Sequence, residues 1–184
     1  MTLVKPEPSR LPSPGELSRS AQIEALETSF ALGERRRDLL EAYIKSHMKA
    51  KEHYYEVSGK NSLSKAGAEL ICGPHGLLPD YDWLGGPLQP PQDDEPYQIT
   101  VKCRLLHHGE FAGAGMGSAS SEITKRDGSV GPRQLDRGLR HNATIKMAQK
   151  SAYIAATLSA TAASEFFTQD IEDEHQEPDK SQHW

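Results

Sequence analysis

Basic side chains at regular spacing are the residues in this sequence with the clearest chemistry. Lys102 and Arg104 are two positions apart, and Lys146 and Lys150 are four positions apart. Residues two apart share a face of a strand, and residues four apart share a face of a helix. Two such pairs on neighbouring elements would present positive charge to phosphate groups, and binding of that kind weakens steeply as salt is added.

Further cations accompany these two pairs. They are Lys125, Arg126, Arg133, Arg137 and Arg140. If the helix packs behind or beside the strands, the set converges on one groove, and this convergence is our prediction. Tyr153 and Tyr97 are expected to stack on unpaired bases, a contact worth about 1–3 kcal/mol per base. For each cation taken singly, the plain alternative is a solvated surface group.

Charge is segregated along the chain, whose formal net charge is −5. Residues 98–163 carry nine basic and four acidic side chains, whereas residues 66–97 carry six acidic side chains and no lysine or arginine. Residues 164–184 carry seven acidic side chains and one lysine. A local basic surface attracts phosphate over a Debye length of about 10 Å whatever the net charge. The acidic end is either a solvated tail or a segment that binds a partner or shields the basic surface.

Catalytic patterns in the sequence are weak. A G-x-x-x-x-G-K-[ST] phosphate loop is absent, which argues against an ATP-driven recombinase or helicase. The glycines between Gly113 and Gly117 lack the third spacing of a dinucleotide-binding turn. Asp80 with Glu122 and Lys125 is an incomplete metal-nuclease pattern, because two residues separate the acid and the lysine where one is needed. We therefore expect a protein that is not an enzyme and needs no cofactor.

Cysteine and histidine form a second incomplete metal pattern. Cys72, His75, Cys103 and His107 are the candidates for zinc, but the paired C-x-x-C spacing of structural zinc sites is missing. Buried thiols and a satisfied histidine are the favoured interpretation, so no metal is predicted.

Two cysteines make no disulfide framework, and no apolar run approaches the roughly 20 residues of a membrane span. These features predict a cytoplasmic protein without a membrane partner.

The expected organisation is one domain over residues 20–170 between two disordered ends. The lead over residues 1–19 is rich in proline, and the tail over residues 171–184 is acidic. A helix capped by Ser20 is predicted to run to about Tyr54. Its expected buried stripe is Ile23, Leu26, Phe30, Leu40, Ile44 and His47 or Met48. Two helices that meet near Gly33 are an equal alternative. A short helix over residues 64–72 follows, and residues 73–96 are predicted to be an irregular connection.

Residues 97–105 alternate between apolar and polar types, which predicts a half-buried strand with Lys102 and Arg104 on its open face. A turn at residues 108–110 leads to a second strand over residues 111–120. The glycines of that second strand indicate either a bulge or the close approach of another backbone. Residues 125–138 are expected to be a basic flexible loop.

The last predicted element is a helix from Asn142 to about Ala163. Its expected core stripe is Met147, Ser151, Ile154, Leu158 and Ala162. Alanine is frequent in its second half, and such small side chains allow a helix to lie close against a sheet.

Several blocks of the sequence resemble a known group of recombination proteins. They are HYYEVSGK at residues 53–60, LSKAGAEL at 63–70, GAGMGS at 113–118, NATIKMAQKSAYIAATL at 142–158 and TAASEFFTQD at 161–170. The blocks are similar to phage and mobile-element members of the Rad-fifty-two-like single-strand annealing superfamily, over roughly residues 40–172.

The resemblance implies an α+β fold with a compact β-β-β-α core, in which a long helix packs across a hairpin or short antiparallel sheet. It also implies rings or filaments whose continuous basic groove binds single-stranded DNA, and ATP-independent annealing of complementary strands in recombination and repair. An exonuclease or a single-strand-binding protein is the implied partner. The implied DNA contacts are Lys102, Arg104, Lys146 and Lys150, with Lys65 and Arg140 as weaker candidates.

Two departures from the family pattern stand out. Ser151 occupies a position where a further basic residue is expected, and residues 125–138 are shorter than the corresponding segment of many relatives. A single-strand-binding accessory protein that does not anneal is the main alternative, and a metal-dependent nuclease is the second.

Overall fold

The structure is a computed structural model that describes residues 19–57, 59–92, 95–124 and 128–169. The chain divides into two compact units between Ala42 and Tyr43. The tail predicted over residues 171–184 lies outside the described residues, as does the lead over residues 1–19 except for Arg19. Those two predictions therefore stay untested.

The N-terminal helix α1 spans Arg19–His47 and passes through Gly33 without a break. It ends seven residues before the expected Tyr54, because a turn follows. Lys51 in this turn has a φ of 68°, and the His53 backbone NH donates to the Lys49 carbonyl at 2.9 Å. The expected buried stripe is confirmed only at its C-terminal end, where Leu40 and Met48 are buried. It is wrong further upstream, since Ile23, Leu26 and Phe30 are each more than half exposed.

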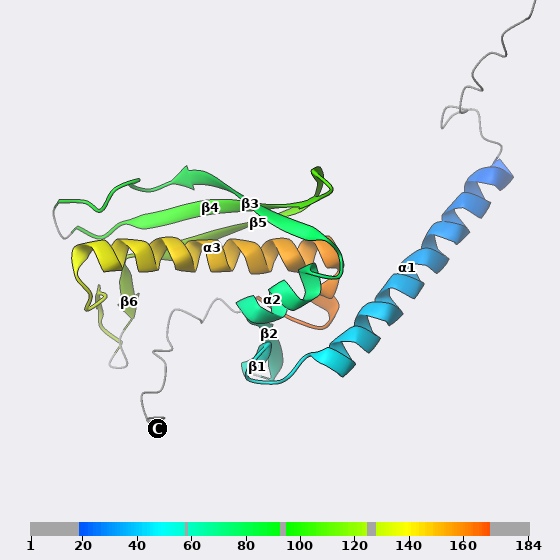
Figure 1. The fold of residues 1–184 in the computed structure, drawn as a ribbon, viewed down its shortest axis with the longest axis horizontal. Coiled ribbons are helices and arrows are strands. Elements are labelled where there is room, and N and C mark those ends of the chain that lie inside the picture. Colours follow the sequence, from blue (N-terminus) through cyan, green and yellow to red (C-terminus); the bar gives the residue numbers. More distant parts are fainter. Residues whose placement is uncertain (1–18, 58, 93–94, 125–127, 170–184) are drawn as a thin grey trace, which may run out of the picture. The chain divides into compact units, whose positions relative to one another are not determined.

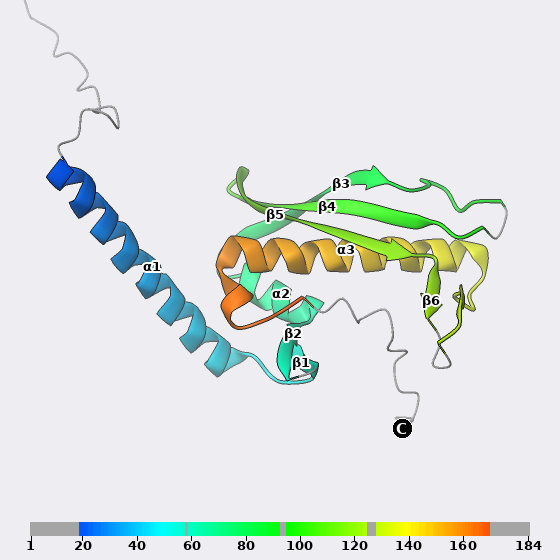
Figure 2. The same ribbon diagram turned by 180° about the vertical axis from the view of Figure 1, so that it is seen from behind.

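The second unit is built on a three-stranded antiparallel sheet with one long helix packed against it. The strands are β3 (Leu77–Gly85), β4 (Gln98–His107) and β5 (Glu110–Ser120), in the order β3-β4-β5. Helix α3 (Arg137–Thr161) lies across one face of this sheet in both views (Figures 1 and 2). The predicted α+β class and the β-β-β-α core are confirmed.

Strand β4 follows the alternation of its sequence. Ile99, Val101, Cys103 and Leu105 are at most 1% exposed, whereas the residues between them are partly open to solvent. His108 and Gly109 both have positive φ, which matches the tight turn that joins two twisted antiparallel strands. The hairpin therefore buries one face and leaves the face of Lys102 and Arg104 open.

The glycines of β5 allow α3 to approach the sheet closely. A Cβ built on Gly115 or Gly117 would overlap the backbone nitrogen of Ala156 or Ala152, respectively. The expected close approach of another backbone is confirmed. The helix begins at Arg137 rather than Asn142, because Asp136 caps it by accepting from the Leu139 backbone NH at 3.0 Å.

The expected core stripe of this helix is partly wrong. Ile154 and Leu158 are buried, but Met147 and Ser151 are only half-buried. The residues with no exposed surface are the small side chains Ala148, Ala152, Ala156, Thr144 and Thr157. A helix that packs against a glycine strand buries its smallest side chains, which hydropathy alone ranks below methionine.

Two segments predicted to be irregular contain strands. Strand β3 lies within residues 73–96 and accommodates Pro79 because it is at the edge of the sheet, where a missing NH is tolerated. Within residues 125–138, β7 (Val130–Pro132) pairs antiparallel with β6 (Glu122–Thr124), which precedes that segment. Residues 125–127, with Lys125 and Arg126, lie outside the described residues.

A small hairpin and a short helix complete the second unit. Strands β1 (Tyr54–Val57) and β2 (Lys60–Leu63) pair antiparallel, and α2 (Lys65–Cys72), the short helix predicted over residues 64–72, follows. The chain then ends its described part with the one-turn helix η1 (Ala163–Glu165) and a segment that pairs with β2 through Thr168.

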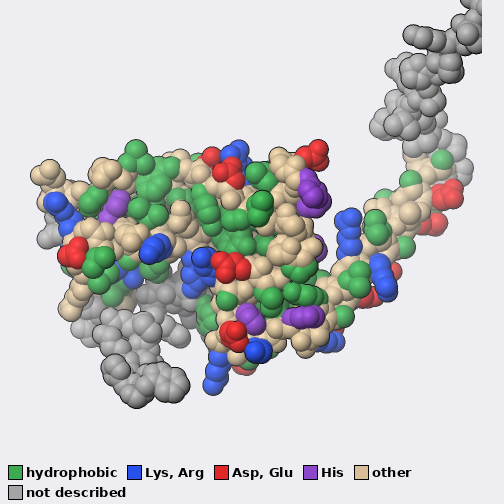
Figure 3. Space-filling model, in the orientation of Figure 1, with side chains coloured by type: hydrophobic (Ala, Val, Ile, Leu, Met, Phe, Trp, Pro, Cys, Tyr) green, Lys and Arg blue, Asp and Glu red, His purple; other side chains and the backbone are tan. Residues whose placement is uncertain are grey.

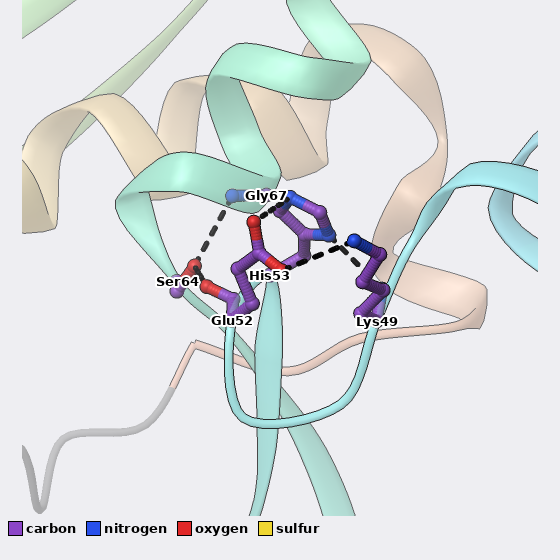
Figure 4. A network of polar contacts seen from close by, with 5 residues as sticks. All are labelled: Lys49, Glu52, His53, Ser64 and Gly67. Carbon is purple, nitrogen blue, oxygen red and sulfur yellow. Dashed lines mark hydrogen bonds and ion pairs between the residues drawn. The ribbon is translucent and has the colours of Figure 1, made fainter.

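Polar contacts fix the start of α2 (Figure 4). The Ser64 hydroxyl donates to the Glu52 carbonyl at 2.9 Å and accepts from the Gly67 backbone NH at 3.1 Å. A Cβ on Gly67 would overlap the His53 carbonyl oxygen, so only glycine fits against this turn. The turn thereby determines where the first residue of α2, Lys65, projects.

Candidate functional site

A groove of about 890 Å³ lies between α2, α3 and β3. Its lining includes Lys65, Glu69 and Cys72 from α2, Lys146, Met147, Gln149, Lys150 and Tyr153 from α3, and Leu77, Leu78, Pro79 and Tyr81 from β3. Figure 3 shows basic side chains next to an acidic one over α2 and α3 on this side of the molecule. Four of the residues predicted from the sequence, Lys65, Lys146, Lys150 and Tyr153, therefore meet at one site.

The helical spacing of α3 places Lys146 and Lys150 on the same side of the groove. Lys146 is exposed and forms no ion pair with any residue that the structure describes, whereas Lys150 is half-buried. Residues four apart on a helix have Cβ atoms about 5–6 Å apart, so both ammonium groups reach the same stretch of groove.

Lys65 faces the groove from α2. Its ammonium is 3.3 Å from a carboxylate oxygen of Glu69, one helical turn along. Both side chains are more than half exposed, so this ion pair is weak and is screened by salt. Three lysines against one glutamate give the groove a net positive charge.

Two tyrosines, Tyr81 and Tyr153, line the groove. Burial raises the pKa of Tyr81 to about 12, with a smaller contribution from Cys103 nearby. Burial likewise raises the pKa of Tyr153. It also raises the pKa of Cys103, which is opposite Tyr81 in the pairing of β3 and β4, to about 11. Cys72 lies 3.3 Å from the Thr157 hydroxyl and is buried. Since a thiol must ionise to attack or to bind metal, these pKa shifts disfavour nucleophilic chemistry at Cys103.

Tyr153 does not present its ring as the sequence suggested. It is only 4% exposed, so the expected stacking of Tyr153 on an unpaired base does not occur without rearrangement. Tyr97 is half-buried and packs against His141, with ring centroids 5.6 Å apart. The Tyr97 ring also lies outside the groove lining.

The expected convergence of all the cations is wrong within one chain. Lys102 is paired with Met116 and Arg104 with Ala114, which puts both on the sheet face opposite the glycines of β5. Those glycines face α3. The pairs Lys102/Arg104 and Lys146/Lys150 are therefore separated by the sheet itself.

The open face of the sheet is electrically balanced. Arg104 donates to Asp80 at 2.5 Å and lies 3.3 Å from Asp82, and both aspartates come from β3. Lys102 is directly opposite Asp82 in the register. Two cations and two carboxylates share this face, so it offers phosphate far less attraction than the groove does.

The remaining predicted cations lie away from the groove. Arg137 donates to the Gln92 carbonyl at 3.2 Å, and neither it nor Arg140, at the start of α3, is part of the groove lining. Arg133 follows β7 and is also outside the lining. The basic segment 125–140 therefore adds no described side chain to the groove.

Metal patterns gain no support from the described residues. Within the ranges that the structure describes, no group of three or more histidine, cysteine, aspartate or glutamate side chains is placed to hold a metal ion. Asp80, the acid of the nuclease pattern, is instead held by Arg104. Across the same ranges, every helix is too short or too polar to span a membrane.

Sequence reasoning missed three features of this region. Glu69 partly neutralises Lys65, and its spacing of four residues was a readable signal. Tyr81 was hidden in a segment assigned as a loop. Gln169 donates to the Ser151 carbonyl at 3.0 Å and contacts its hydroxyl at 2.7 Å. These residues are 18 positions apart, and no local sequence pattern predicts their contact.

Comparisons with known proteins found no matching family model, no matching curated protein and no matching solved structure.

Proposed function

We propose that this protein binds single-stranded DNA in the groove between α2, α3 and β3 and anneals complementary strands without ATP. The observation that carries the proposal is the placement of Lys146 and Lys150 along one wall of the groove, with Lys65 on the other. The sequence resemblance to single-strand annealing proteins supports the same function.

The side chains of the groove suit binding of a nucleic-acid backbone better than catalysis of a reaction. Three ammonium groups can each neutralise a phosphate. Burial raises the pKa of Tyr81 to about 12 and that of Cys103 to about 11, so both side chains stay protonated near neutral pH. Phosphate contacts of this kind hold a strand without reading its sequence and leave base edges free to pair. Pairing of the two DNA strands then supplies the free energy of annealing.

Three phosphate contacts are too few for tight binding by one chain. Each phosphate contact contributes about −0.7 to the slope of log Kobs against log salt concentration. The three contacts of one groove therefore give a slope of only about −2. We propose that chains assemble as a homo-oligomer, because several linked grooves on one strand multiply weak contacts into avidity. Lys102 and Arg104 lie on the opposite face of the sheet beside Asp80 and Asp82, so they are not part of the proposed contact.

A mixing experiment with labelled complementary oligonucleotides tests the function. The protein without ATP should accelerate pairing over the spontaneous rate, both with magnesium and with EDTA. Acceleration should disappear in K146E/K150E while the fold is retained.

The same experiment separates the two alternatives. Tight binding of one strand without faster pairing would favour a single-strand-binding accessory protein. Magnesium-dependent loss of labelled strand would favour a nuclease, and Asp80→Asn would then abolish that loss.

A further inference from the structure

The last described residues contact α3 one position beyond a lysine that lines the groove. Thr168 pairs with Ser62 of β2, and its backbone NH donates to the Asn61 carbonyl at 2.8 Å. Gln169 then donates its side-chain amide to the Ser151 carbonyl and contacts the Ser151 hydroxyl, at 3.0 and 2.7 Å. Ser151 is the residue after Lys150. The chain therefore leaves its described part beside one of the groove lysines.

The sequence that continues from this point is acidic. Residues 170–184 contain Asp170, Glu172, Asp173, Glu174, Glu177 and Asp179 against one lysine, Lys180. The groove itself carries Lys65, Lys146 and Lys150 against Glu69. The two charge patterns are complementary, and both belong to one chain.

The chain that follows Gln169 is long enough for its carboxylates to reach the groove lysines. Ten residues separate Gln169 from Asp179, which allows a span of up to roughly 35 Å. The first carboxylates are only one to five residues from the Gln169 anchor. A segment held on so short a connection has an effective concentration in the millimolar range at the groove.

We propose that the acidic segment 170–179 binds in cis to the groove of Lys65, Lys146 and Lys150 and competes there with single-stranded DNA. The segment supplies carboxylates where the nucleic acid supplies phosphates. Only a strand that contacts several grooves at once displaces the segment efficiently. The segment therefore reduces the binding of short polyanions, which contact a single groove. The competition, though not the docking itself, rests on the function proposed above.

Carbodiimide cross-linking of the full chain tests the docking without any DNA. This zero-length reagent joins a lysine amine to a carboxylate in contact with it. We expect cross-links from Lys146 or Lys150 to carboxylates of residues 170–179 at low salt, and their loss at high salt. Lys65 and Glu69, already 3.3 Å apart, provide the internal positive control. A mixture of ¹⁴N and ¹⁵N chains should give no mixed cross-links, because the contact is in cis.

Binding of an oligothymidylate to two matched variants tests the competition. E172Q/D173N/E174Q removes three charges from the tail, and E24Q/E27Q/E34Q removes three from exposed positions of α1. We expect the tail variant to bind at least about fivefold more tightly at low salt, the low end of a typical coupling free energy. The α1 variant should change affinity less than twofold.

Several results would overturn the inference. They are the absence of tail cross-links while the Lys65–Glu69 cross-link forms, mixed-isotope cross-links, or equal gains in affinity from both variants. The two proposals fail differently. Tail cross-links with no oligothymidylate binding by any variant would refute DNA binding and leave the docking in place.

Discussion

Gly115 of β5 and Ala156 of α3 lie backbone against backbone, because a Cβ on Gly115 would overlap the Ala156 amide nitrogen. Gly117 stands in the same relation to Ala152 one turn earlier on α3. This close contact between helix and sheet holds α3 in place and so fixes the direction in which Lys146 and Lys150 project.

Gly115→Ala should therefore destabilise the protein strongly. An added methyl group in a packed interface usually costs about 1–3 kcal/mol, and here the backbones themselves must separate. Urea unfolding measures the loss. Gly33→Ala is the matched control, because its added Cβ would meet no described atom within 4 Å beyond the nearby backbone of its own helix, and alanine favours a helix by about 1 kcal/mol. Equal effects of the two substitutions would contradict the packing described here.

Ser64→Ala should weaken the second unit by about 1 kcal/mol. The substitution removes the hydroxyl that caps α2 and also the bond to the Glu52 carbonyl. Ser64→Asp should restore most of the stability, since aspartate accepts from the same backbone NH. Thermal unfolding of the three proteins is the measurement, and a Ser64→Asp protein no more stable than Ser64→Ala would show that the cap is unimportant.

Stability should fall in alkaline solution because Cys103 is buried. Its pKa rises from the ordinary 9.0 to about 11 through burial, so the folded state keeps the proton longer than the unfolded chain does. The stabilising effect is complete below pH 9 and is lost as the pH rises through 11, by about 2–3 kcal/mol in total. Urea unfolding between pH 8 and 10 should show this slope in the natural protein. Cys103→Ala should show a shallower slope, and an unchanged slope would remove Cys103 as its cause.

Arg104→Gln should leave single-strand binding within about twofold of the natural protein. Asp80 and Asp82 already neutralise this arginine on the sheet face away from the groove. Its ion pairs are substantially exposed, so the variant should also lose less than about 1 kcal/mol of stability. A tenfold loss of affinity in a binding titration would place the open sheet face in the site.

The sequence was sufficient where the periodicity was undisturbed. Alternation from Ile99 to Leu105 predicted β4 and the open face of its cations, and the glycines of β5 predicted the close approach of α3. Strand β3 was missed because Pro79 and the surrounding glycines read as a loop, and an edge strand tolerates both. Propensity describes local preference, whereas pairing with β4 is a long-range contact.

The site was predictable only in part for a similar reason. Helical spacing correctly joined Lys146 to Lys150, and the alternation of β4 placed Lys102 and Arg104 on its open face. The predicted single groove overlooked that α3 must then cover the other face of the sheet. This arrangement separates Lys102 and Arg104 from the helix lysines. The anchor of Gln169 on Ser151 likewise joins residues that only the folded chain brings together.

The most direct test of the account is the affinity of K146E/K150E for a labelled oligothymidylate, measured by fluorescence anisotropy over a range of salt concentrations. K51E/K60E makes the same change in charge at two exposed lysines outside the groove. The account predicts that the groove variant loses most of its binding and that its salt slope becomes shallower by about 1.4 for each chain that contacts the strand. The control should keep both its affinity and its slope, and equal behaviour of the two variants would contradict a site in this groove.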